Sequence, residues 1–363
     1  RTPKAIGHQL GYSDPEVYGM KIAILTNMAP FISGGAEVLT RDLKNKLTEY
    51  GHDAQIIRFY FSYSKNEHLL DGIIASKLTR IENTDCVIAT KFPAYLIEHQ
   101  NKKVWLIHQF RQAYDLENTA FDCFYHSEAD QRIKASIRKA DIAALSKVDP
   151  VYTISPVISS RLKHYCGIDS SPLFPPLLDD AKYYFQEVGD FVFLPSRVND
   201  SKRQGLLVEA MRYTKTSVKL LLSGRGDTQQ DEENIFQLIE KYDLSHKVIY
   251  LNRFISDEEK YELFSKCLMV AFVPLDEDYG YVTLEAFASK KPVLTCEDSG
   301  CPPYFVSQKE NGYIVAPDPE EIARCFDYAY SQKHCVDQMG KNAYQSYLDK
   351  DITWDQVIRR LTE

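Results

Sequence analysis

Short apolar runs alternate along this chain with segments whose apolar residues recur every three or four positions. MKIAILT (20–26) predicts a buried strand, and the segment after it predicts a helix that ends at Gly51, since glycine commonly closes a helix. A second helix is predicted at 156–167 and ends at Gly167. The other predicted strands of this half are AQIIRFYF (54–61), CVIAT (86–90), KKVWLIH (102–108) and VYTIS (151–155).

The alternation stops at SSPLFPPLLDDAKYYFQEVGD (170–190), where prolines interrupt regular structure, and then begins again. The second set of predicted strands is FVFLPS (191–196), KLLLSG (219–224), KVIYLN (247–252), MVAFVPL (269–275), KPVLT (291–295) and YIVAP (313–317). Helices are predicted between and after them at 203–214, 235–244, 257–267, 281–290 and 319–333.

Repeated alternation of strand and helix predicts parallel sheets covered by helices. The chain has 363 residues, which exceeds the size of one ordinary core. We therefore expect an α/β protein with two doubly wound parallel-sheet domains, residues 1–180 and 181–344. Ligands of such sheets bind beyond the carboxyl ends of the strands, so we expect the site in the cleft between the two domains.

Charge and cysteine content exclude several kinds of partner. The net charge of -8 at pH 7 argues against nucleic-acid binding. The eight cysteines form no C-x-x-C pair and have no histidines at metal-site spacing, which is typical of reduced thiols in the cytoplasm. No apolar run is long enough to span a membrane and no secretory signal opens the chain, so a cytoplasmic protein is expected. We interpret residues 1–19, which are polar and aperiodic, as an extension before Met20.

Two features of the first domain are candidates for ligand contact. Gly34 and Gly35 precede a predicted helix, so their N–H groups can face an anion with the help of the helix dipole. The pair is equally compatible with an ordinary turn, and it lacks the G-x-G-x-x-G spacing of dinucleotide sites. His108 ends a strand at the sheet edge where ligands bind, although a lone histidine is more often structural.

PSRVNDSKRQG follows the first strand of the second domain and supplies candidate cations. Arg197 and Lys202 suit a diphosphate, because a guanidinium binds as a fork and an ammonium as a point charge. The alternative is a solvated loop. Arg203 favours that alternative, since three cations cannot all face one ligand.

DEDYGYVTLEAFASKKPVL (276–294) places two glutamates where a strand turns into a helix. Glu285 lies among apolar residues, where an unpaired carboxylate is costly, and both Glu277 and Glu285 could accept hydrogen bonds from sugar hydroxyls. A solvated position is the alternative for each. Gly280 lets the backbone approach a ligand closely, and the helix after it opens with N–H groups that suit a phosphate. These N–H groups belong to Tyr281, Val282 and Thr283.

Taken in order, these motifs resemble the retaining GT-B glycosyltransferases of glycosyltransferase family four. The resemblance runs from Met20 to the end of the chain. It depends most on E-x7-E with an internal glycine, combined with Arg-x4-Lys upstream. The motifs that carry it are GGAE (34–37), WLIHQF (105–110), TISPVISSRL (153–162), FPPL (174–177), SRVNDSKRQGLLVEA (196–210), DEDYGYVTLEA (276–286) and ITWDQVIRRL (352–361).

The resemblance implies two Rossmann-like domains that face a central cleft, with an acceptor domain first and a donor domain second. It also implies that a C-terminal helix, about 345–363, packs back on the first domain. The donor would be a nucleoside diphosphate sugar, with a UDP-sugar expected first. The acceptor would carry a hydroxyl on a glycan, a lipid-linked saccharide or a small molecule, as in polysaccharide biosynthesis.

The resemblance also implies roles for residues of the donor domain. Arg197 and Lys202 would bind the diphosphate, and Glu285 would bind the ribose hydroxyls. Glu277 and the backbone after Gly280 would bind the donor sugar. No metal or other cofactor is expected, because these cations would neutralise the departing diphosphate themselves.

Three residues of the acceptor domain receive roles by the same resemblance. Gly34 and Gly35 would lie near the phosphate or the acceptor, and His108 would lie beside the donor sugar.

Arg253 and Phe254 stand in LNRFIS, where many members have a glycine, and we expect them near the nucleotide base. The residues expected to take part in the reaction are His108, Arg197, Lys202 and Glu277.

Two other functions use the same site. One is a sugar-nucleotide epimerase of the GT-B type, which would form product without an acceptor. The other is a non-catalytic nucleotide-sugar-binding subunit of an assembly complex. The basic run in QRIKASIRKADIAALSK could contact the anionic inner face of a membrane peripherally, although a solvated helix face explains it equally.

Overall fold

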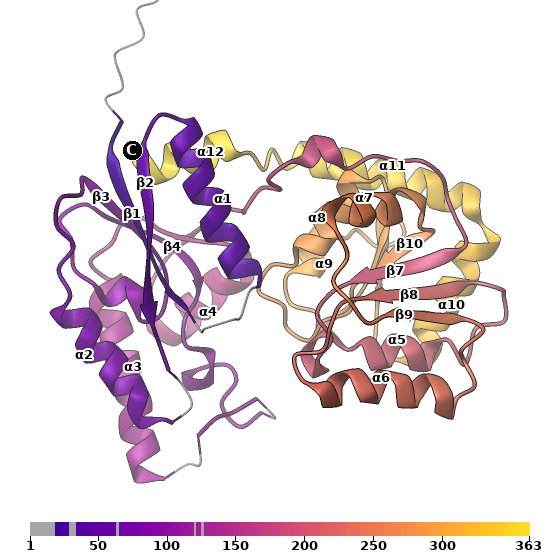
Figure 1. Cartoon of the computed structure of the whole chain (residues 1–363), viewed down its shortest axis with the longest axis horizontal. Coiled ribbons are helices and arrows are strands. Elements are labelled where there is room, and N and C mark those ends of the chain that lie inside the picture. The colour runs from indigo at the N-terminus through magenta and orange to yellow at the C-terminus, as the bar shows by residue number, and fades with distance from the viewer. Residues whose placement is uncertain (1–18, 29–33, 63–64, 120, 125–126) are drawn as a thin grey trace, which may run out of the picture.

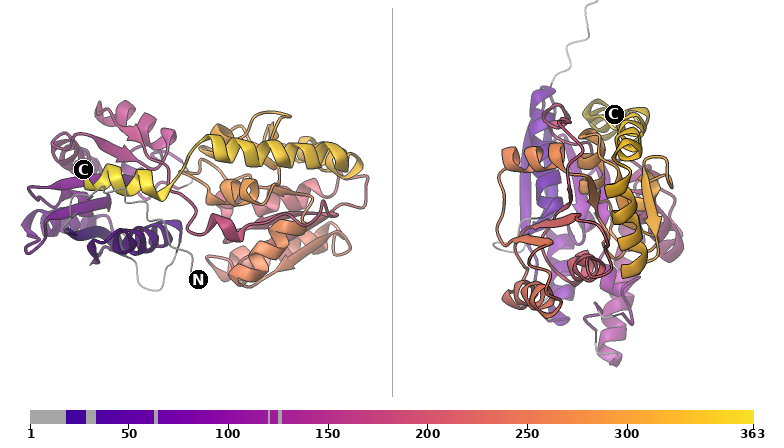
Figure 2. Two further views of the ribbon diagram at one scale, coloured as in Figure 1. Left: turned by 90° about the horizontal axis from the view of Figure 1, so that it is seen from above. Right: turned by 90° about the vertical axis from the view of Figure 1, so that its right-hand side faces the viewer.

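The computed structural model describes residues 19–28, 34–62, 65–119, 121–124 and 127–363. It contains two lobes, each built around a six-stranded sheet with helices packed around it (Figures 1 and 2). All paired strands within each sheet run parallel. This confirms the predicted class of two doubly wound α/β domains. Apart from Gly19, the predicted N-terminal extension lies outside the described residues.

The N-terminal domain contains the first six strands. They are β1 (Lys21–Met28), β2 (Asp53–Tyr60), β3 (Cys86–Lys91), β4 (Lys102–His108), β5 (Val151–Thr153) and β6 (Ser171–Pro172), in the order β2-β1-β3-β4-β5-β6. Its helices are α1 (Gly35–Glu49), α2 (Glu67–Leu78), α3 (Glu128–Leu145) and α4 (Pro156–Cys166), with short 3-10 turns η1 (Ala94–Leu96) and η2 (Arg111–Ala113).

The central strands of this domain are apolar because both of their faces are covered. Every residue of β3 is buried, and β4 buries its run from Val104 to Ile107 before His108 emerges at its carboxyl end. The helix α4 is defined by local signals at both ends. Ser155 caps its first turn, and Gly167 closes it with a φ of 70°.

The C-terminal domain contains the second sheet, in the order β12-β11-β10-β7-β8-β9. The strands are β7 (Phe191–Pro195), β8 (Lys219–Ser223), β9 (Val248–Leu251), β10 (Met269–Ala271), β11 (Val293–Cys296) and β12 (Gly312–Val315). The helices are α5 (Gln204–Ala210), α6 (Gln229–Lys241), α7 (Asp257–Lys266), α8 (Tyr281–Ala288), α9 (Pro302–Phe305) and α10 (Pro319–Ser331), with 3-10 turns η3 (Asp180–Lys182) before the sheet and η4 (Asp200–Lys202) after β7.

The neighbouring positions of β7 and β10 matter for the site. Met269 and Val270 of β10 pair with Val192 and Phe193 of β7. Parallel neighbours end at the same edge of a sheet, so the segments that follow these two strands lie side by side. Two motifs about 80 residues apart in the sequence are thereby brought together.

The last segment of the chain joins the two domains. It consists of two helices, α11 (Lys333–Asp349) and α12 (Trp354–Thr362), in place of the single helix expected at about 345–363. Only α12 reaches the N-terminal domain, where the chain ends (Figures 1 and 2). Trp354 is buried there, donates to the carbonyl of Leu177 at 3.0 Å and packs edge-on against Trp105.

Three other predicted elements differ from the observed ones. Helix α6 begins at Gln229, six residues before the expected start, because Thr228 and Asp231 form a capping box in a polar first turn. Strand β10 ends at Ala271, where the chain leaves the sheet toward the cleft. The proline-rich segment adds the short strand β6 to the first sheet. It lies between the two sheets, and the boundary at residues 180 and 181 within it stays a prediction.

The described part of the chain contains no helix long and apolar enough to cross a membrane. All eight cysteines are free thiols.

Candidate active site

A cavity of about 600 Å³ lies between the two domains, lined by the carboxyl ends of strands and the loops that follow them. Nine of the predicted site residues line it: Gly34, Gly35, His108, Arg197, Lys202, Glu277, Gly280, Tyr281 and Val282. Within the described ranges, four do not: Arg253, Phe254, Thr283 and Glu285. The expected cleft is therefore present, and it gathers most of the expected residues from both domains.

The N-terminus of α1 forms one wall of the cavity. A Cβ placed on Gly34 would lie 3.8 Å from Nη2 of Arg197, so this glycine faces the opposite domain. Glu37, in the first turn, accepts from the Gly34 N–H at 2.9 Å, and its other oxygen lies 3.0 Å from Nζ of Lys91. The Glu37 carboxylate therefore occupies the N-terminus of α1, and Lys91 pairs with it. The sequence interpretation missed Lys91, although it ends β3 at the ligand-binding edge.

His108 contributes a neutral imidazole to the cavity. Its Nδ1 lies 2.7 Å from the carbonyl oxygen of Gln109, which can only accept, so Nδ1 carries the proton and Nε2 is left as the acceptor. Burial lowers the pKa of His108 below its ordinary value, and the nearby Asp278 carboxylate offsets part of that effect. A neutral ring at pH 7 can accept a hydrogen bond from a sugar hydroxyl.

Two of the three cations of the segment after β7 line the cavity. Arg197 pairs with Asp227 at 2.5 Å, and Lys202 contacts the carboxylate of Glu277. Arg203 turns away, donating to the carbonyl of Val273 at 2.6 Å and pairing with Asp298. Because Arg203 binds other parts of its own domain, only Arg197 and Lys202 among the cations of this segment face the cavity. Two cations can face one ligand, so the objection based on three no longer applies.

The start of α8 forms the second wall. Gly280 has a φ of 86°, and a Cβ there would lie 2.7 Å from the ring of Phe272, so no larger residue fits without displacement. Tyr281 and Val282 open the helix and line the cavity. The N–H of Thr283 already donates to the Gly280 carbonyl at 3.0 Å, and the Thr283 side chain is buried away from the cavity.

The two glutamates of the E-x7-E motif occupy different environments. Glu277 lies in the cavity, and its backbone is fixed by hydrogen bonds with Ser299 and Cys301. The Glu285 side chain is only 12% exposed, and its Oε1 accepts from the hydroxyl of Tyr183 at 2.8 Å and from Lys260 at 3.0 Å. This pairing explains how a carboxylate is tolerated in an apolar helix.

Lys260 keeps its charge beside Glu285. Burial by itself lowers the pKa of Lys260, but the Glu285 carboxylate outweighs it and the pKa lies above the ordinary lysine value. By contrast, the residues expected near the nucleotide base lie at the surface. Arg253 pairs with Glu259 at 2.6 Å, and Phe254 is 70% exposed.

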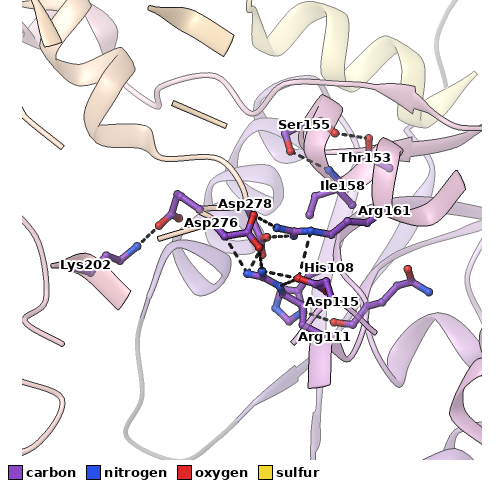
Figure 3. A network of polar contacts seen from close by, with 12 residues as sticks. His108, Arg111, Asp115, Thr153, Ser155, Ile158, Arg161, Lys202, Asp276 and Asp278 are labelled. Atoms are coloured by element: carbon purple, nitrogen blue, oxygen red, sulfur yellow. Dashed lines mark hydrogen bonds and ion pairs between the residues drawn. The ribbon is translucent and has the colours of Figure 1, made fainter. Parts of the chain in front are cut away.

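An ion-pair cluster links the two domains beside the cavity, and the sequence interpretation did not anticipate it. Figure 3 shows Arg111 and Arg161 of the N-terminal domain pointing toward Asp276 and Asp278 of the loop after β10. Asp115 supplies a third carboxylate from the N-terminal side. Arg111, Asp278 and Glu277 all line the cavity.

The described residues contain no cluster of three or more histidine, cysteine, aspartate or glutamate side chains that could bind a metal ion. Cations at the cavity come instead from Lys91, Arg111, Arg197 and Lys202. The arrangement can therefore accept an anionic ligand, and His108 and Glu277 add hydrogen-bond acceptors to the same cavity.

Comparison with known proteins gives matches to sugar-transferring enzymes. Residues 179–346 match the family model described as glycosyl transferases group 1. The chain is 28% identical over 154 residues to the alpha-1,3/1,6-mannosyltransferase ALG2 of Mus musculus, which covers 40% of this chain and 37% of that protein. It is 31% identical over 131 residues to N-acetylgalactosamine-N,N'-diacetylbacillosaminyl-diphospho-undecaprenol 4-alpha-N-acetylgalactosaminyltransferase of Campylobacter jejuni, covering 36% and 34%. The aligned segments span little more than a third of these relatives.

A solved structure matches over both domains. Anabaena Alr3699/HepE in complex with UDP covers 94% of this chain and 100% of its own, with a TM-score of 0.69 and 16% sequence identity. The two sheets and their connections therefore form a GT-B fold, as expected.

Proposed function

We propose that this chain, whose residues 179–346 match the model of glycosyl transferases group 1, transfers a sugar from a nucleoside diphosphate sugar to an acceptor hydroxyl. The observation that carries the proposal is the shared wall of the cavity. Arg197 and Lys202, from the segment after β7, lie beside the start of α8, which follows β10. Two cations and a helix N-terminus facing one cavity suit the diphosphate of such a donor.

The chemical difficulty of the reaction is the negative charge that develops on the departing diphosphate. Arg197, Lys202 and the opening N–H groups of α8 stabilise this charge inside the cleft. The Lys202 ammonium contacts Glu277 before the donor binds, and it turns toward the diphosphate as the charge develops. Since these groups neutralise the diphosphate, we propose that the reaction needs no metal ion.

The sugar is transferred with retention of its anomeric configuration. Glu277, which is proposed to contact the sugar, is engaged by Lys202, and Glu285 is engaged by Tyr183 and Lys260. Neither carboxylate is arranged as a nucleophile of the kind that retaining glycosidases use. The acceptor therefore attacks from the face that the diphosphate leaves, and a diphosphate oxygen takes the acceptor proton.

The remaining contacts orient the donor. Nε2 of His108 accepts a hydrogen bond from one hydroxyl of the donor sugar, and Glu277 accepts a hydrogen bond from a second hydroxyl. Glu285 binds the ribose diol through its second carboxylate oxygen once the donor has entered. Gly34 and Gly35 leave room for the acceptor at the opposite wall, where a side chain at Gly34 would approach Arg197.

A UDP-sugar is the proposed donor, in keeping with the UDP named for the Anabaena structure of the same fold. The proposed acceptor is a hydroxyl of a glycan or of a lipid-linked saccharide, the latter in keeping with the diphospho-undecaprenol in the name of the Campylobacter relative. Peripheral contact of the basic helix α3 with an anionic membrane surface belongs to the same proposal.

The test is a transfer assay with UDP-, GDP-, ADP- and dTDP-sugars and a lipid diphosphate-linked saccharide or simple glycoside as acceptor. Release of nucleoside diphosphate gives the rate, and proton NMR of the product gives its anomeric configuration. We expect one class of donor to be consumed only with acceptor, and the product to keep the donor configuration. An inverted product, an epimerised sugar formed without acceptor, or donor binding with no turnover would each contradict the proposal.

A further inference from the structure

Five charged residues form a cluster that we call the inter-domain ion cluster. Arg111, Asp115 and Arg161 belong to the N-terminal domain, and Asp276 and Asp278 belong to the loop between β10 and α8. The cluster's ion pairs cross from one domain to the other, so whether they form depends on whether the cleft is closed.

The contacts across the domains are short and numerous. Arg161 lies 2.5 Å from Asp276 through Nη2 and 2.5 Å from Asp278 through Nη1, so one guanidinium bridges both aspartates. Arg111 contacts the same pair at 2.5 Å and 3.3 Å, and it also donates to the Asp276 carbonyl at 3.2 Å. Asp115 lies 2.6 Å from Arg111 and 3.4 Å from Arg161 on the other side.

Most of the cluster is shielded from water, with Asp276 at its edge, where the side chain is 40% exposed. The side chains of Arg161, Arg111 and Asp278 are 13%, 18% and 17% exposed. Burial by itself raises the pKa of Asp278, but Arg111 and Arg161 outweigh it and hold this pKa below its ordinary range. Three carboxylates face two guanidinium groups, so neither arginine has charge to spare for a phosphate. Their partners are on the protein itself.

The two arginines of the cluster bind the loop through the residues on either side of Glu277. Asp276 and Asp278 turn toward the N-terminal arginines (Figure 3). Glu277 between them contacts Lys202 of its own domain instead. Asp276 has a φ of 50°, in the left-handed region that aspartate adopts more readily than most residues other than glycine. Three residues later, the Tyr279 hydroxyl donates to the Pro175 carbonyl at 2.5 Å.

We propose that Arg111 and Arg161 are positioning residues that couple closure of the two domains to the placement of Glu277 and the start of α8. When the domains separate, the loop loses its N-terminal anchors and Glu277 is free to leave its position opposite Lys202. When they close, the bridged aspartates return it. The inference rests on the proposed function, because the loop that is placed belongs to the proposed donor site.

Arg161→Ala is the informative variant, because Arg161 bridges the loop without lining the cavity. Arg161→Lys keeps the charge but cannot bridge two carboxylates in the same fixed geometry. Arg80→Ala is the control, since Arg80 is exposed and donates to the carbonyls of Lys77 and Thr79 within the N-terminal domain. Small-angle X-ray scattering measures closure, calorimetry measures nucleotide affinity, and the transfer assay measures kcat and KM.

We expect Arg161→Ala to enlarge the radius of gyration of the free protein and to lower kcat by about a hundredfold, as for a misplacement of about 1 Å at a reacting centre. Nucleotide affinity should stay within about threefold, because the C-terminal domain supplies most of that site, and a threefold change is about 0.65 kcal/mol. Arg161→Lys should fall between wild type and Arg161→Ala, and Arg80→Ala should match wild type.

An unchanged kcat in Arg161→Ala would overturn the inference, as would a loss of kcat with the scattering of the wild type. If Arg161→Ala does not fold, the isosteric Asp276→Asn takes its place with the same expectations, because Asp276 binds Arg161 without lining the cavity. If the wild type transfers no sugar from any donor, the proposed function fails. Scattering of the variants still decides the closure step in that case, and an unchanged radius of gyration overturns it.

Discussion

Replacing Lys202 with alanine tests the donor site sharply, because this side chain connects the two motifs of the C-terminal domain. Its Nζ contacts the Glu277 carboxylate and lies 5.6 Å from the centre of the Phe272 ring, and the side chain is only 19% exposed. In the proposed reaction its charge shifts from Glu277 to the departing diphosphate. The variant therefore loses one stabilising cation and also leaves an uncompensated carboxylate beside the diphosphate.

The size of each effect can be estimated separately. Removal of one group that stabilises developing charge costs about 2.7–4 kcal/mol, or about 10²–10³ in kcat. The repulsion from the unpaired Glu277 appears as non-additivity. Residues that contact each other typically couple by about 0.5–3 kcal/mol, so Lys202→Ala/Glu277→Gln should be less impaired than the sum of the two single variants by that amount.

The assay is release of nucleoside diphosphate at saturating donor, with kcat and KM measured for both single variants and the double variant. Lys219→Ala is the matched control, because Lys219 is an exposed lysine at the opposite end of the same sheet. Melting temperatures confirm that each variant is folded. Wild-type turnover in Lys202→Ala, or effects that add to within about 0.5 kcal/mol, would refute the reasoning.

Four further predictions follow from individual contacts. Glu285→Ala should weaken binding of free nucleoside diphosphate at least about tenfold, or about 1.4 kcal/mol, in calorimetry, and unchanged affinity would remove its ribose role. Gly280→Ala should lower both the melting temperature and the activity, because the left-handed backbone and the approach to Phe272 cost about 1–3 kcal/mol, and a fully active variant would contradict this. Burial raises the pKa of Asp141 to about 7, so between about pH 4 and 7 the folded protein holds a proton that the unfolded chain lacks, and this contribution to stability is lost as pH rises. Urea denaturation at pH 5 and pH 8 should therefore show that the free energy of unfolding of Asp141→Asn rises relative to that of the wild type by about 2–3 kcal/mol between the two pH values. A constant difference between the two proteins would contradict the raised pKa of Asp141. Activity should survive excess chelator, whereas complete loss that a divalent cation restores would contradict metal independence.

The fold was largely predictable because its signals are local. The apolar runs of β3 and β4 are buried on both faces, and Gly167 ends α4 where a left-handed residue is needed. Prediction failed where local polarity hid an element. The first turn of α6 is polar, so the apolar period began six residues late, and the break between α11 and α12 carries no proline or glycine.

Only those residues of the site were predictable whose type and position in a motif indicate a function by themselves. Arg197, Lys202 and Glu277 were identified as charged residues at strand ends, and they line one cavity. The contacts that organise them join distant positions. Arg161 meets its aspartate partners 115 and 117 residues away, and Glu285 meets Tyr183 at a separation of 102. No spacing rule connects such pairs, because their proximity depends on the tertiary fold of the second domain for Glu285 and on how the two domains pack for Arg161.

The most direct measurement of the central claim is a calorimetric titration with UDP-, GDP-, ADP- and dTDP-sugars in the presence of chelator. It is carried out on the wild type and on Arg197→Ala, which removes a cavity cation whose partner, Asp227, lies outside the cavity lining. The account predicts that one class of donor binds the wild type and that Arg197→Ala weakens it at least about tenfold, or about 1.4 kcal/mol. Binding of no donor, or equal affinity in both proteins, would contradict a donor site on this wall of the cleft.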